Sequence, residues 1–141
     1  MSESIYNLQQ LASLYRHASV VNKQREYTNR QEAQKCADSA IENPQYENDC
    51  RNQEQEYLRM AATWEQIAAI QLEYALICEN PVNEYQHILS DLEILLNKIR
   101  HCREVQCSNE ACREILELIQ TYCLKDSLLY DNYPQYCGHI N

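Results

Sequence analysis

The chain has almost none of the residues that tight turns require, and this scarcity limits the folds open to it. Its 141 residues include one glycine and three prolines. β-Hairpins and bulges depend on glycine because it readily adopts the left-handed backbone conformations that two-residue loops need. Residues that favour helix, such as Glu, Gln, Leu and Ala, are abundant instead. The sequence therefore predicts an all-α fold, with the length of one domain.

Two Glu-Asn-Pro motifs divide the chain, at residues 42–44 and 79–81. In each motif the asparagine suits a helix N-cap and the proline suits the first helical position. With a third start at Ser108-Asn109, the predicted helices span 3–41, 45–78, 82–106 and 109–130. We expect a mostly antiparallel four-helix bundle, or an array of helical hairpins, with short Asn-Pro turns. The bundle takes residues 1–130, and a tyrosine-rich C-terminal tail, 131–141, packs on it.

The hydrophobic pattern differs among these helices. In 82–106 apolar residues recur at intervals of three and four, which favours an amphipathic helix with one buried face. The second half of 45–78 is apolar almost all round, and we expect it to be the most buried element. Residues 22–32 carry only Tyr27 as an apolar side chain, so this stretch is expected to be solvated or covered by a partner.

Six of the eight cysteines form three pairs, each placed symmetrically about an expected turn. The pairs are Cys36 with Cys50, Cys102 with Cys112, and Cys123 with Cys137. Residues equidistant from the turn of a helical hairpin lie at the same height on facing helices. Disulfides need Cα atoms about 4.4–6.8 Å apart, and only directly facing residues on packed helices come that close. All six are therefore disulfide candidates, with free core cysteines as the alternative.

A metal site is another interpretation of the cysteines. It uses His101, Cys102, Cys107 and Cys112, which lie near one expected helix junction. Structural zinc favours closer cysteine spacings, so the chain would have to break its helix near Cys107 to hold the ion. No Cys-x-x-Cys motif is present. We therefore expect no metal and no cofactor, and keep these four residues as the alternative.

The cellular compartment follows from the N-terminus and the cysteines. The first residues contain neither the basic nor the apolar region of a signal peptide, and no apolar run is long enough to span a membrane. This favours a soluble intracellular protein. Disulfides oppose that assignment because the cytosol is reducing. Cys102-x9-Cys112 resembles, in one spacing, the twin Cys-x9-Cys of helical-hairpin proteins of the mitochondrial intermembrane space. That compartment, or secretion with the leader absent, is the alternative.

The net charge of −9 argues against nucleic acid as a partner, because phosphate binding requires a cationic surface. No catalytic or nucleotide-binding motif is present, so we do not expect an enzyme. Tyrosine is enriched at interfaces, and the candidate contact residues are Tyr27, Tyr130, Tyr133 and Tyr136.

These observations predict a non-catalytic interaction or assembly protein, or an accessory subunit of a larger complex. Its partner is another protein or a second copy of the chain. The first alternative is a disulfide-stapled helical protein of an oxidising compartment that binds an apolar ligand. The second alternative is a protein that handles metals or thiols through Cys and His.

Overall fold

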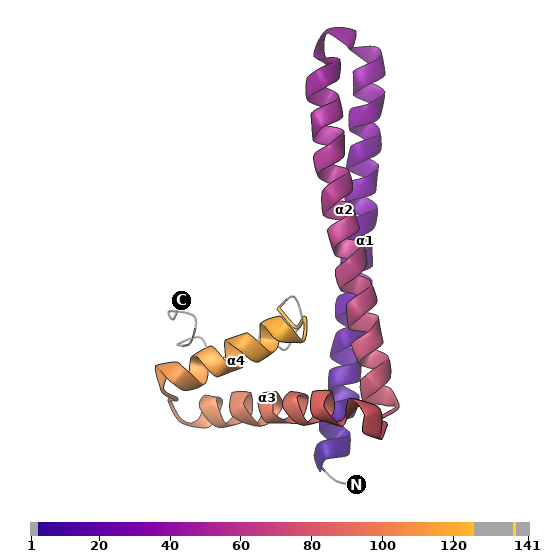
Figure 1. Ribbon diagram of the computed structural model, residues 1–141. Coiled ribbons are helices and arrows are strands. Elements are labelled where there is room, and N and C mark those ends of the chain that lie inside the picture. The colour runs from indigo at the N-terminus through magenta and orange to yellow at the C-terminus, as the bar shows by residue number, and fades with distance from the viewer. Residues whose placement is uncertain (1–2, 126–136, 138–141) are drawn as a thin grey trace. The chain divides into compact units, whose positions relative to one another are not determined.

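A computed structural model describes residues 3–125 and Cys137, with side chains from Leu8 onward. These residues form helices and no β-strand (Figure 1), which confirms the all-α prediction. The helices are α1 (Glu3–Glu42), α2 (Glu47–Glu79), α3 (Gln86–Glu104) and α4 (Asn109–Thr121). Short 3-10 helices, η1 (Pro44–Tyr46) and η2 (Asn83–Tyr85), precede α2 and α3. The predicted helical segments are therefore all present.

The two Glu-Asn-Pro motifs act differently at the helix starts. Asn43 is the N-cap of η1 and Pro44 its first residue, as predicted, although the Asn43 side chain bonds back to the carbonyl of Ser39. The second motif does not begin the next helix directly, because the N-cap of η2 is Val82 and not Asn80. Ser108 caps α4 by accepting a hydrogen bond from the backbone N–H of Ala111 at 3.2 Å.

Helix α4 ends at Thr121, earlier than the predicted residue 130. Cys123 adopts a left-handed backbone conformation with φ of 55°. The N–H of Leu124 then donates to the carbonyl of Ile119 at 2.9 Å, and that of Cys123 donates to Gln120 at 3.3 Å. This pair of hydrogen bonds is the Schellman motif, in which glycine usually takes the left-handed position. Sequence patterning missed this stop because a cysteine occupies that position.

The chain separates into two compact units, described here one at a time. Residues 19–69 form one unit, which we call the arm. Residues 1–18 and 70–141 form the other, and we call its described residues the body. The predicted tail boundary at residue 131 lies outside the described residues.

The body has a core of large apolar side chains from all four helices. Its fully buried members include Leu11, Leu92, Leu95, Ile115 and Ile119. Three tyrosines complete it: the ring of Tyr74 stacks on Tyr15 at 5.4 Å and meets the edge of Tyr122 at 5.7 Å, between ring centroids. The Tyr15 hydroxyl donates to the Tyr122 carbonyl at 2.6 Å, so this core also holds the end of α4.

The arm is an antiparallel pairing of the C-terminal part of α1 with the N-terminal part of α2. Ser19 Oγ donates to the carbonyl of Ala68 at 2.7 Å, and Arg30 forms an ion pair with Glu65 at 2.9 Å. Nearer the turn, Cys36 Sγ lies 3.9 Å from Gln53 Oε1. The sequence distance between partners falls toward the turn, as an antiparallel hairpin requires.

Small and polar side chains form the seam of the arm. Its positions alternate by four and three residues, the spacing of a coiled coil. On α1 they are Ser19, Asn22, Glu26, Asn29, Ala33, Cys36 and Ala40; on α2 they are Cys50, Glu54, Tyr57, Ala61, Trp64 and Ala68, all buried or half-buried. The expectation that 22–32 is a solvated stretch is wrong in part, because its polar residues occupy this seam. Asn22 is fully buried, and Arg25 lies 4.7 Å above the Trp64 ring.

The second half of α2 is less buried than its composition predicts. Ala75, Ile77 and Cys78 face the body core, but Leu72 and Leu76 are 41% and 48% exposed. An all-round apolar helix needs neighbours on every side, and in the described residues these two leucines lack such cover.

Candidate functional site

The structure contains two disulfides, and their pairing differs from the predicted one. Cys102 bonds to Cys107 and Cys112 bonds to Cys137, with Cα atoms 5.3 Å apart in both pairs. The predicted Cys102–Cys112 and Cys123–Cys137 bridges are wrong. Because α3 ends at Glu104, the following segment turns back and brings Cys107 to Cys102. Cys123 ends α4 instead of facing a partner across a helical hairpin.

The third predicted bridge, between Cys36 and Cys50, is not formed in the structure. Both residues are half-buried thiols at seam positions of the arm. Burial and the neighbouring Cys50 raise the pKa of the Cys36 thiol. Symmetry about the Asn43-Pro44 turn therefore placed the two residues on the same seam, but the structure leaves them unbonded.

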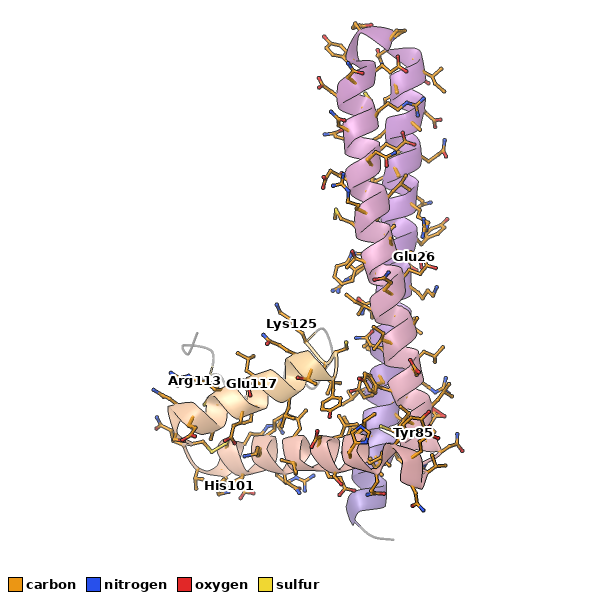
Figure 2. All side chains as sticks on the ribbon, in the orientation of Figure 1. Glu26, Tyr85, His101, Arg113, Glu117 and Lys125 are labelled. Atoms are coloured by element: carbon orange, nitrogen blue, oxygen red, sulfur yellow. A yellow bond between two sulfur atoms is a disulfide. The ribbon has the colours of Figure 1, made fainter. Side chains whose placement is uncertain are left out.

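The alternative metal site is also wrong. Cys102, Cys107 and Cys112 are all in disulfides, and a disulfide sulfur is not the thiolate that binds zinc. His101 is exposed at the C-terminal end of α3, as Figure 2 shows. Within residues 3–125 and Cys137, no group of three or more His, Cys, Asp or Glu side chains is placed to hold a metal ion.

The two remaining thiols belong to the body core. Cys78 is buried, and burial followed by the charge of Glu79 raises its pKa to about 12. Burial also raises the pKa of Cys123, which is half-buried. Since the thiolate is the reactive form of cysteine, neither residue is suited to nucleophilic chemistry near neutral pH.

An apolar pocket of about 340 Å³ lies between α3 and α4, beside the Cys102–Cys107 disulfide. It opens to solvent, so it is not the enclosed cavity of a carrier. Its lining residues are Ile94, Asn97, Lys98, His101, Cys102, Cys107 and Ala111. Three of the seven lining residues, His101, Cys102 and Cys107, are among the candidate metal ligands of the sequence. The apolar wall was missed, since it depends on how α4 packs against α3.

A second pocket, also about 340 Å³, has several acidic residues in its lining, among them Asp91, Glu114 and Glu117. Lys98 bonds to Glu114 at 2.5 Å, and the Tyr122 hydroxyl donates to Asp91 Oδ2 at 2.5 Å. Burial, and then this hydrogen bond, raise the pKa of Tyr122 to about 12. Figure 2 shows Glu117, another lining residue, on α4. Four of the titratable lining residues, Asp91, Lys98, Glu114 and Tyr122, are therefore engaged in contacts between side chains.

The predicted contact residues fall in different parts of the chain. Tyr27 is 57% exposed on the arm, and its hydroxyl accepts a hydrogen bond from Gln31 Nε2 at 3.0 Å. Tyr130, Tyr133 and Tyr136 lie outside the described residues. The exposed leucines of α2 were not predicted as contact residues, although their helical spacing in the sequence offered that signal.

No protein-family model, curated protein or solved structure matches this chain. Among the described residues, no helix is both long enough and apolar enough to cross a membrane. The function is therefore argued from the side chains alone.

Proposed function

We propose that this protein is a non-catalytic interaction protein that binds another protein through the exposed side of α2 in the body. Leu72 and Leu76 are one helical turn apart and are 41% and 48% exposed. Ala75 and Cys78 on the same helix are buried in the core, so the helix is held in one orientation with the leucines outside the core. This pair of exposed leucines carries the proposal, because a partner that covers them removes apolar surface from water.

The charge of α2 supports a partner with basic groups around an apolar ridge. In the body, α2 carries Glu73 and Glu79 and no basic residue. Glu73 lies between the two leucines in the sequence, and Glu79, three residues after Leu76, forms an ion pair with Arg16. A second copy would bring like charges together, whereas a basic amphipathic segment pairs both surfaces. The proposed partner is therefore a different protein that presents an amphipathic, lysine- or arginine-rich helix.

The test uses two synthetic amphipathic helices, one of leucine and lysine and the other of leucine and glutamate. Fluorescence anisotropy is expected to detect binding of the lysine peptide and not of the glutamate peptide. Replacing both leucines, Leu72→Ser with Leu76→Ser, is expected to weaken binding by at least about tenfold, since two apolar contacts are lost.

The matched control is Val20→Ser with Ile41→Ser, which removes two apolar side chains that are 68% and 70% exposed on the arm. This control should bind as the unchanged protein does. Equal binding by both double variants would refute the docking surface. A dimer in light scattering that Leu72→Ser and Leu76→Ser abolish would replace the proposed partner with a second copy.

A second proposal concerns the compartment, and the two disulfides favour it. Cysteine pairs persist in oxidising surroundings and are reduced in the cytosol. We propose that the protein works in an oxidising compartment. When the alkylating reagent is added together with denaturant at cell lysis and no reductant is present, it should modify four cysteines, namely Cys36, Cys50, Cys78 and Cys123. All eight should react after reduction. Eight modified cysteines without reductant would contradict this assignment.

A further inference from the structure

The two disulfides differ in how exposed their cysteine residues are. Cys112 and Cys137 are 1% and 0% exposed, so that bond is enclosed by the body. In the other pair Cys102 is 2% exposed, whereas Cys107 is only half-buried and lines a pocket that opens to solvent. Thiol–disulfide exchange begins when a thiolate attacks one of the two sulfurs, so it depends on access to the bond. The exposed part of Cys107 makes its disulfide the more accessible of the two.

The apolar pocket lies against the same bond. Cys102 and Cys107 both line it, and Ile94 and Ala111 add apolar surface on α3 and α4. At about 340 Å³ its volume is near the lower limit for ligand pockets, about 300 Å³. An apolar side chain of a peptide that enters this pocket brings the neighbouring residues of that peptide next to the disulfide.

The groups around the pocket suit the chemistry of exchange. Lys98 and His101 line it, with Lys98 in an ion pair with Glu114, and the guanidinium of Arg103 follows in the last turn of α3. Cationic surroundings favour the thiolate form of an approaching cysteine, which is the attacking species.

We propose that Cys102–Cys107 is a thiol–disulfide exchange site for peptides that carry a cysteine next to an apolar side chain. The peptide thiolate attacks Sγ of Cys107, the Cys102–Cys107 bond breaks, and a new S–S bond joins the peptide to Cys107. The electron pair of the broken bond leaves on Sγ of Cys102, and the resulting thiolate takes a proton from water. A second thiol in the peptide then releases it as a disulfide and leaves Cys102 and Cys107 reduced.

This activity goes beyond the proposed binding function, which uses the α2 leucines and needs neither sulfur. Of the four free thiols, Cys78, Cys123 and Cys36 are less reactive because burial raises their pKa values. The disulfide of Cys112 and Cys137 serves as an internal reference for an enclosed bond in the same molecule.

The experiment mixes the folded protein with a reduced peptide that has one cysteine between leucines, or with the same peptide in which serines replace the leucines. Reactions are quenched with acid and alkylated, and non-reducing mass spectrometry locates the adduct. The expected product is a mixed disulfide at Cys107, formed about tenfold faster with the leucine peptide because the pocket buries its side chain. The Cys112–Cys137 bond is expected to stay intact.

Two variants separate the pocket from general exposure. Ile94→Ser removes an apolar wall residue that is 46% exposed, and should slow the leucine peptide several-fold without changing the rate of the serine peptide. Val82→Ser removes a side chain of the body that is 48% exposed and does not line the pocket, and should change neither rate. Three results would each overturn the proposal: no adduct at Cys107, equal rates for both peptides, or equally fast attack on Cys112–Cys137. Each leaves the α2 docking surface untouched.

Discussion

The arm and the body bury different kinds of side chain. The body packs leucine, isoleucine and tyrosine around a continuous core and carries both disulfides. Apart from Tyr57 and Trp64, the arm packs small and polar residues along its coiled-coil seam, and Arg30 forms an ion pair with Glu65. A small-residue seam buries little apolar area, so it gains less from the hydrophobic effect and depends more on close helix contact.

This difference teaches that one helix can take part in two kinds of packing. Helix α1 presents Leu11 and Tyr15 to the body core, and Ala33 and Ala40 to the arm seam. The body should therefore be most sensitive to loss of volume, and the arm to gain of volume. Trp64, the single tryptophan of the chain, lies in the arm, so its fluorescence reports on that unit alone.

The largest effect is expected from a cavity in the body. Leu92→Ala removes a fully buried side chain, and should lower the free energy of unfolding by about 3 kcal/mol. Ile94→Ala, two residues along the same helix at a position 46% exposed, should cost less than about 1 kcal/mol. Urea titration followed by circular dichroism measures both. Similar losses would mean that the two sides of α3 do not differ in burial.

The second effect is overpacking of the arm. Ala68→Leu adds a large side chain at a fully buried seam position, where the helices approach closely, and should cost about 2 kcal/mol. The adjacent Ala69→Leu is at an exposed position and should change stability by less than about 0.5 kcal/mol. Trp64 fluorescence during urea titration separates them. Tolerance of leucine at residue 68 would show that the seam is loosely packed.

Alkaline pH should weaken the body before the arm. Burial raises the pKa of Tyr122 from 10.0 to about 12, and that of Cys78 from 9.0 to about 12. A group whose pKa is raised on folding gives stability that is full below its unfolded value and is lost as pH rises through the folded value. The body should therefore lose stability between about pH 9 and 12. Among the thiols and tyrosines of the described arm, Cys36 is the one whose pKa is raised.

Acid should weaken the arm through Glu26. The hydrogen bond from Arg30 lowers the pKa of Glu26, so the stability that the ionised carboxylate contributes is present above the ordinary value of 4.5 and is lost as pH falls below it. Thermal melts across this pH range, followed by tyrosine absorbance and Trp64 fluorescence, compare the two units. An arm that melts first in alkali would contradict the assignment.

The smallest effect concerns the backbone at the end of α4. Cys123 is the non-glycine residue with positive φ among those described, and the arm contains no such position. Cys123→Gly should relieve the left-handed strain and stabilise the body by about 0.5 kcal/mol, after the greater entropy of unfolded glycine is subtracted. Cys123→Ala keeps the strain and should not stabilise. Thermal melting distinguishes the two variants, and a destabilised glycine variant would indicate that the cysteine side chain matters more than its φ.

The sequence by itself determined the helices. The scarcity of glycine and proline, the Asn43-Pro44 turn and the Ser108 cap set the all-α class and most helix starts, because these are local preferences of the backbone. The symmetry of Cys36 and Cys50 about their turn likewise placed both on one seam. Local signals were sufficient wherever a neighbour in the sequence was also the neighbour in space.

Tertiary structure decided the sulfur chemistry and the surface. Cys102 pairs with Cys107 because α3 ends at Glu104 and the chain turns back, and Cys112 pairs with Cys137 from 25 residues away. In the polar stretch 22–32, Asn22, Glu26 and Asn29 lie in the seam and the other residues are half-buried or exposed, while Leu72 and Leu76 remain exposed. The composition of the chain shows which side chains are apolar enough to be buried. Which of them are buried depends on where the other helices pack, and that is a property of the whole fold.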